Sequence, residues 1–181
     1  MRLLLILLIA PIMGFTKVEY NEKYVILHFK NIVNDYRKEN GLPEIKIDEN
    51  LRFFSDNRAK CMKDDYSHSS DYELRKLLNP SSAGIKFAGE NIANLNVPSQ
   101  NNKPYYSSYD KNNNRLKDIS DILNKFAIGD ADEYDMAMYC FLTWKYSTDH
   151  NKLLLSKNIK WFYLSYEKSK TIYHFAFISV G

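Results

Sequence analysis

The hydrophobic period of this chain changes near its C-terminus, and this change constrains the fold more than any other feature. From Glu22 to Asn40 apolar residues recur every three or four positions, which predicts an amphipathic helix. Near the C-terminus two aromatic-rich runs instead alternate between apolar and polar residues, which predicts a β-hairpin of Ile159–Glu167 with Thr171–Val180. A chain with both patterns is expected to pack helices on a small antiparallel sheet, an α+β sandwich.

Between these two regions the sequence predicts further elements. Gly41 and Pro43 are expected to end the first helix. Asp48 is expected to cap a second helix that runs to about Asp65. Further helices are predicted at Asp71–Leu78, Arg115–Phe126 and Asp130 to about Tyr146, and an extended segment at Gly84–Asn94. The Asn- and Tyr-rich stretch at about 96–114 is predicted to be a loop, and residues 22–181 are expected to form one domain.

The N-terminal residues have the pattern of an export signal. Arg2 precedes the apolar run Leu3–Ala10, and Pro11 and Gly14 follow it. The run is shorter than the roughly 20 residues that a membrane-spanning helix needs. Residues 1–16 are therefore expected to be a secretory signal peptide, and an uncleaved N-terminal membrane anchor is the alternative. The expected location is the periplasm, the cell surface or the medium.

Charge and cysteine content bear on the class of partner and on the redox chemistry. The formal net charge is +3 and the basic residues are spread along the chain, so nucleic acid is not an expected partner. Cys61 and Cys140 lie in predicted helices and could form a disulfide in an oxidising compartment. We expect instead that both are small buried apolar residues, and their spacing fits neither a zinc knuckle nor a redox motif.

Three short motifs carry the residues that could do chemistry. Ser67-His68 follows the second predicted helix, Gly89–Ala93 contains Glu90, and Trp144–His150 contains a second histidine. Imidazole and carboxylate groups can bind zinc, and a carboxylate paired with a histidine can act as a base. The same groups could instead hydrogen-bond one another as a structural latch. The sequence has no Gly-x-Ser-x-Gly motif and no cysteine beside a histidine, which disfavours covalent catalysis.

The order of these motifs resembles the bacterial branch of the CAP superfamily, the cysteine-rich secretory, antigen 5 and pathogenesis-related 1 proteins, whose unit is also called the SCP domain. The resemblance covers about Tyr24 to Gly181. It depends on Asn-Gly-Leu-Pro, Ser-His, Gly-Glu-Asn-Ile-Ala and Trp-x-x-Ser-x-x-His-x-x-Leu-Leu in this order. It implies an α-β-α sandwich with a cleft lined by two histidines and two acidic residues, which in some members hold a divalent metal.

Compared residue by residue with the family, this cleft is incomplete. His68 and Glu90 match the first family histidine and the glutamate of the Gly-Glu-Asn motif. Ser147 falls where the eukaryotic branch has its second acid, and His150 is the histidine that bacterial relatives commonly add. His174 lies in a segment similar to the final family strand. The resemblance thus implies Zn²⁺ or another divalent metal at His68 and Glu90, with His150 or His174 as a further ligand.

The expected function is an exported CAP-domain protein that binds a lipid, a sterol, or a host or envelope protein. The cleft and the loop at about 96–114 would supply the contacts, with Tyr105, Tyr106 and Tyr109 as a possible recognition surface. A metal-assisted hydrolase of peptides or phosphodiesters is the alternative, and a purely structural envelope protein is a third. Ser147 in place of an acid favours binding over catalysis. Membrane contact is expected only through an uncleaved N-terminus.

Overall fold

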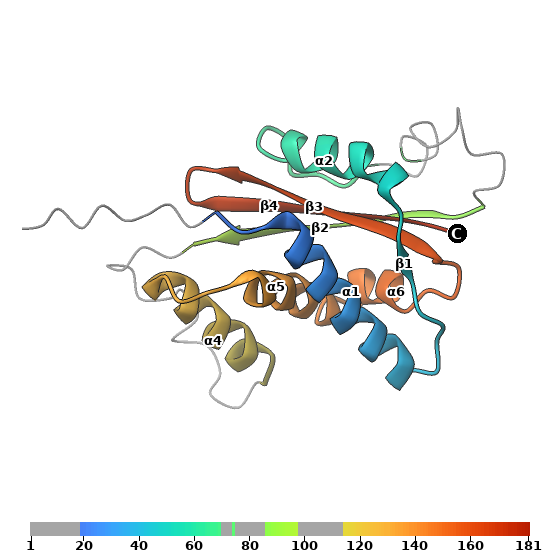
Figure 1. The fold of residues 1–181 in the computed structure, drawn as a ribbon, viewed down its shortest axis with the longest axis horizontal. Coiled ribbons are helices and arrows are strands. Elements are labelled where there is room, and N and C mark those ends of the chain that lie inside the picture. The colour runs from blue at the N-terminus through green and yellow to red at the C-terminus, as the bar shows by residue number, and fades with distance from the viewer. Residues whose placement is uncertain (1–18, 70–73, 75–85, 98–113) are drawn as a thin grey trace, which may run out of the picture.

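The computed structural model describes residues 19–69, 74, 86–97 and 114–181, and the architecture below concerns these residues. The elements in chain order are α1 (Glu22–Glu39), β1 (Lys46–Ile47), a 3-10 turn (Glu49–Leu51), α2 (Arg52–Cys61), β2 (Ala88–Asn96), α4 (Asn114–Ile128), α5 (Glu133–Lys145), α6 (Thr148–Leu154), β3 (Trp161–Ser169) and β4 (Ile172–Val180). Figure 1 shows α2 above the sheet and α1, α4, α5 and α6 below it. The expected α-β-α sandwich is therefore confirmed.

The sheet has the strand order β1-β3-β4-β2 and contains the predicted hairpin. β3 and β4 pair antiparallel, and β2 pairs antiparallel with the other side of β4. Lys170 makes the tight turn of the hairpin with φ 54. β1 pairs in parallel with β3, through Lys46 and Ile47, so the sheet is mixed rather than purely antiparallel. A strand of two residues has no period that a sequence pattern could reveal.

The second predicted helix is shorter than expected. The carboxylate of Asp48 accepts a hydrogen bond from the Asn50 N–H at 3.0 Å, but it caps the 3-10 turn that precedes α2. α2 ends at Cys61 rather than at about Asp65, and turns follow it. The chain therefore leaves the helix one turn early, before the first site motif begins.

The helix predicted from Asp130 begins later, and a separate short helix follows it. Asp132 caps α5: its carboxylate accepts from the Asp135 N–H at 2.9 Å, and the Asp135 carboxylate accepts from the Asp132 N–H at 3.1 Å. This reciprocal capping box fixes the start of the helix two residues beyond the prediction. α6 was not expected, because its seven residues are too few for a clear helical period.

Two apolar clusters lie on opposite faces of the sheet, because successive strand residues point to opposite sides. The larger cluster lies between the sheet and the helices α1 and α5, and its centre is an aromatic group of Phe29, Trp144, Phe162 and Phe177 with ring centroids 5.3–5.8 Å apart. The smaller cluster lies under α2 and consists of Ala59, Met62, Ile92 and Ala176.

Two buried polar residues of α1 hold the chain segments around its C-terminal half. Asn34 exchanges two hydrogen bonds with the backbone of Ile45, at 2.9 and 3.0 Å, which fixes the segment that leads into β1. Arg37 is fully buried, and its guanidinium donates to three backbone carbonyls, those of Pro43, Leu154 and Ser156. The buried polar residues of α1 thus fix both the segment between α1 and β1 and the end of α6.

Both cysteines are free in the structure, which excludes the disulfide there. Cys140 is buried as expected, but Cys61 is exposed, because α2 presents Ala59 and Met62 to the sheet instead. Of the remaining expectations, residues 1–16, the helix at 71–78 apart from Leu74, and most of the loop at 96–114 lie outside the described residues. Within the described part, no helix combines the length and the apolar character needed to cross a membrane.

Candidate functional site

The site forms at the edge strand β2, where the two helical layers approach one another. Neighbouring residues of this strand point to opposite faces of the sheet. Glu90 shares its face with Ile92, which packs against α2, and Asn91 points to the layer of α5 and α6. The outward carbonyls of the edge are also covered: Trp144 Nε1 donates to the Ile92 carbonyl at 2.9 Å and the Tyr139 hydroxyl to the Asn94 carbonyl at 2.8 Å. The edge of the sheet is therefore closed by side chains of α5.

The Glu90 carboxylate is enclosed by hydrogen-bond donors. Oε1 accepts from the Ser69 N–H at 3.0 Å and from His68 Nδ1 at 3.2 Å. Oε2 accepts from Arg58 Nε at 2.8 Å and from the Ser69 hydroxyl at 2.9 Å. The side chain is only 2% exposed. Because a carboxylate offers about four acceptor positions, all of them are occupied by this chain's own groups.

Arg58 and Ser69 belong to this site although the motifs did not include them. Arg58 reaches the site from α2, is 12% exposed, and also donates to the Ser67 carbonyl through Nη2. Arg58 thus connects Glu90 to the loop that follows α2, and this contact orders the segment that carries His68. The signal for Arg58 was present in the sequence, since it is a charged residue on an otherwise apolar helix face. Ser69 gave no signal beyond its position next to His68.

His68 and His150 come together across the edge of the sheet. Their Nε2 atoms are 3.1 Å apart and their ring centroids 5.2 Å. When both rings are neutral, His68 donates from Nδ1–H to Glu90. Its Nε2 is then unprotonated and accepts a hydrogen bond from the Nε2–H of His150. This leaves the His150 Nδ1 without a proton, and that atom is buried with no partner among the described residues. Burial, and then the nearby His68, lower the pKa of His150, which keeps it neutral near pH 7.

The Gly-Glu-Asn motif also positions α6, the helix that carries His150. The Asn91 amide donates to the His150 carbonyl at 3.1 Å. A Cβ at Gly89 would lie 2.4 Å from Leu153 Cδ1, so α6 packs directly on the backbone of β2. Ser147 is the N-cap residue of α6 but makes no side-chain hydrogen bond there. Its backbone carbonyl accepts the first hydrogen bond of the helix, from the Asn151 N–H at 2.8 Å, and His150 lies in this first turn.

His174 lies elsewhere on the sheet and does not meet the other two histidines. It pairs with Asn94, four residues along β2 from Glu90, which is roughly 13 Å at the usual strand rise. His174 is 4% exposed, and its Nδ1 is 2.8 Å from Asn94 Oδ1. Its Nε2 is buried without a partner among the described residues. Burial, and then the ammonium of Lys63, lower the pKa of His174.

The residues present were compared with the requirements of a metal centre. Two ligands on one zinc ion at 2.0–2.1 Å lie about 3.3 Å apart, close to the separation of the two Nε2 atoms. Glu90 then stands behind His68, where a carboxylate orients a metal-binding imidazole. In the part of the chain that the structure describes, no group of three His, Cys, Asp or Glu side chains surrounds a common point. Catalytic zinc sites use three protein ligands, and His68 and His150 are placed to supply two of them.

Comparison with known proteins establishes the fold. No family model matches the sequence, and no curated protein matches it. A solved extracellular protein containing an SCP domain, from Bacillus anthracis, is similar at a TM-score of 0.52 and 20% identity, over 87% of this chain and 41% of that one. A cysteine-rich secretory protein from Staphylococcus aureus gives a TM-score of 0.49 and 15% identity, over 90% of this chain and 42% of that one. The chain thus spans about two fifths of each solved chain.

Proposed function

We propose that this chain, which has the fold of an SCP domain as the order of its motifs predicts, is an exported protein that binds a ligand outside the cytoplasm. The Glu90 cluster, formed by Glu90 with Arg58, His68 and Ser69, holds the fold together instead of catalysing hydrolysis. The observation that carries this proposal is the Glu90 carboxylate, whose acceptor positions are all filled by Arg58, His68 and Ser69. A general base needs a free lone pair within reach of its substrate.

The cysteines support the same conclusion about chemistry. Burial raises the pKa of the Cys140 thiol well above its ordinary value, and a buried thiol is a poor nucleophile. Cys61 lies on the exposed side of α2, away from the face that packs on the sheet. The proposed protein therefore works by binding, and its ligand is a lipid, a sterol, or a host or envelope protein.

Export is supported by two independent observations. The first is the N-terminal pattern of Arg2, an apolar run and small residues. The second is the SCP-domain neighbour from Bacillus anthracis, which is described as extracellular. Both favour the periplasm, the cell surface or the medium as the place of action.

The test is a binding screen with the full chain produced through an export pathway. Phospholipid vesicles with and without a sterol, and immobilised envelope and matrix proteins, are titrated at neutral pH. Saturable binding to one of these is expected, with no hydrolysis of casein or of a chromogenic phosphodiester above that of a Glu90→Gln variant. If none of the probes binds saturably, the proposal is contradicted. Hydrolysis that Glu90→Gln abolishes would also contradict it.

A metal-assisted hydrolase of peptides or phosphodiesters is the second candidate, and the 3.1 Å separation of His68 and His150 favours it. When bound, the ion would supply an activated water. Zinc titration separates the candidates: this one expects a single equivalent on the native chain, none on His150→Ala, and native binding on the control His174→Ala. Zinc binding that His150→Ala leaves intact would exclude the pair as ligands.

A further inference from the structure

A cleft of about 520 Å³ lies along a face of α6 that does not carry His150. Its lining residues are Lys145, Tyr146, Thr148, Asn151, Lys152 and Leu155, and none of them belongs to the Glu90 cluster. Positions 148, 151, 152 and 155 recur at helical spacing, so they share one side of the helix. This volume lies within the range of small-molecule sites. We call it the α6 cleft.

The cleft carries positive charge that acids nearby do not fully neutralise. The Lys145 ammonium lies over three aromatic rings, at 5.1 Å from the ring centre of Tyr36, 5.5 Å from Phe141 and 5.8 Å from Tyr146. Its position is therefore fixed by aromatic faces. The Lys152 ammonium contacts the Asp149 carboxylate at 2.8 Å, but both side chains are largely exposed, and such bridges are weak.

The layer beneath the cleft adds a third cation. The fully buried Arg37 binds the carbonyls of Leu154 and Ser156, the residues on either side of Leu155 in the lining. Its Nη2 has no partner among the described residues. Two carboxylates contact residues of the cleft: Asp149 pairs with Lys152 at 2.8 Å, and Asp118 accepts from the Tyr146 hydroxyl at 2.9 Å. Against the three cations Lys145, Lys152 and Arg37 they leave a net positive charge, which favours an anionic ligand.

The cleft also offers groups that a bare anion would not use. The side chains of Thr148 and Asn151 line the cleft, and their hydroxyl and amide groups can hydrogen-bond the hydroxyl groups of a ligand. Tyr146 and Leu155 add apolar surface beside these polar groups.

We propose that the α6 cleft binds an anionic carbohydrate, a sugar that carries a carboxylate or phosphate group. Lys145 and Lys152 bind the anion, Thr148 and Asn151 hydrogen-bond sugar hydroxyls, and the apolar surface contacts the C–H face of the ring. A neutral sugar would not use the positive charge of the two ammonium groups, and an inorganic anion would not use the apolar surface of the cleft. This goes beyond the proposed function, because it names a different ligand class and a site separate from the Glu90 cluster.

The test is calorimetric titration of the full chain with a galacturonate trisaccharide, a sugar phosphate, maltotriose and inorganic phosphate. The first two are expected to bind saturably and to weaken in high salt, and the last two about tenfold more weakly, as expected for the loss of a charged or hydroxyl contact. Lys145→Met and Lys152→Gln should each weaken anionic-sugar binding by about tenfold. Lys152 is exposed, so its variant tests the proposal even where Lys145→Met perturbs folding.

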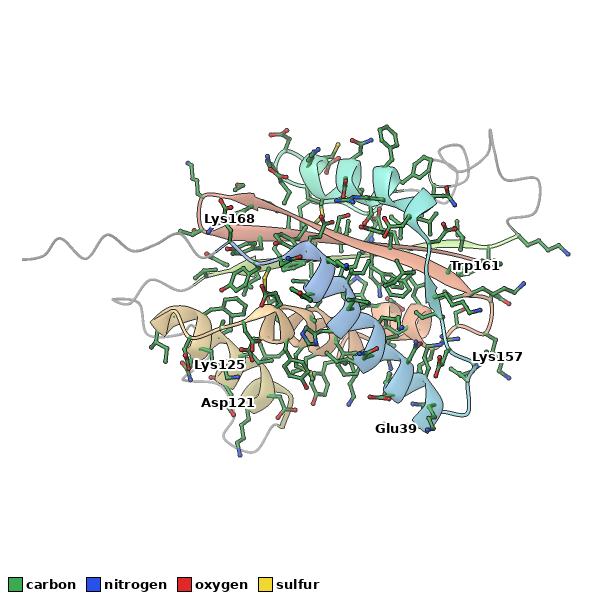
Figure 2. All side chains as sticks on the ribbon, viewed as in Figure 1. Glu39, Asp121, Lys125, Lys157, Trp161 and Lys168 are labelled. Carbon is green, nitrogen blue, oxygen red and sulfur yellow. The ribbon has the colours of Figure 1, made fainter. Side chains whose placement is uncertain are left out.

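Lys168→Met is the matched control, because Lys168 also lies over an aromatic ring, at 4.8 Å from the centre of Tyr173. Figure 2 shows it at the hairpin end of the sheet, away from α6. Its variant should bind like the native chain. Equal affinity for inorganic phosphate, native affinity in Lys152→Gln, an equal loss in Lys168→Met, or no saturation with either anionic sugar would each overturn the proposal. None of these results depends on whether lipid or protein ligands bind.

Discussion

Replacing Glu90 by Gln tests directly whether the cluster stabilises the fold. The substitution keeps the shape of the side chain, but it removes the charge and turns one acceptor oxygen into an amide group. That amide would face two donors, either Arg58 and the Ser69 hydroxyl or His68 and the Ser69 N–H. Arg58 would also remain almost buried without its counter-ion. Breaking a buried ion pair from one side costs about 3–5 kcal/mol, so we expect a loss of that size in the free energy of unfolding.

Such a loss is large against the 5–15 kcal/mol that typically stabilises a domain. The assay is equilibrium unfolding in urea at neutral pH, followed by circular dichroism, in metal-free buffer. Glu167→Gln is the matched control, because Glu167 pairs with Lys63 at 2.9 Å while the two side chains are 31% and 37% exposed. We expect it to cost no more than about 1 kcal/mol. If Glu90→Gln costs no more than this control, the cluster is not a latch.

Three further changes test other parts of the structure. His150 and His174 have lowered pKa values in the folded protein, so the stability that comes from their neutral forms is complete above about pH 6.5. That stability is lost as the pH falls through their folded-state pKa values. Urea unfolding measured from pH 7 to 5 should show the loss, and His174→Gln should make the free energy of unfolding depend less on pH. Gly89→Ala should cost about 1–3 kcal/mol by overpacking against Leu153, and Leu153→Ala in the same chain should recover part of the loss; unchanged unfolding midpoints would refute the contact. Arg37→Met should cost about 3 kcal/mol or more in the same assay, since three carbonyls lose a buried cationic donor; a loss below about 1 kcal/mol would show that water replaces it.

The sequence predicted those parts of the fold that depend on long periodic segments. α1 was found because its apolar residues recur on one face over 18 residues, and the hairpin because β3 and β4 are each nine residues long and rich in aromatic residues. β1 and α6 were missed, since two and seven residues leave almost no pattern. Their positions depend on tertiary contacts instead: Asn34 binds the segment before β1, and Gly89 lets α6 approach β2.

The candidate site was predictable in its members and not in its geometry. The motifs supplied Glu90, His68 and His150, but left open whether His150 or His174 completes the group. The pairing register decides this, because His174 lies opposite Asn94 and not opposite Glu90. No local pattern encodes the register of β2 against β4, since 75 residues lie between the end of β2 at Asn96 and the start of β4 at Ile172.

The edge position of β2 explains why three motifs so far apart in sequence meet. An interior strand has neighbours on both sides, so groups from the two helical layers could not touch around it. At the edge, Glu90 reaches Arg58 and His68 in the α2 layer, while the next residue, Asn91, reaches the carbonyl of His150 on α6. Two consecutive residues thereby fasten both layers to one strand, and the histidines meet beyond it at 3.1 Å. The buried side chains of Glu90 and Asn91 therefore need polar partners from both helical layers for structural reasons alone, independently of any reaction.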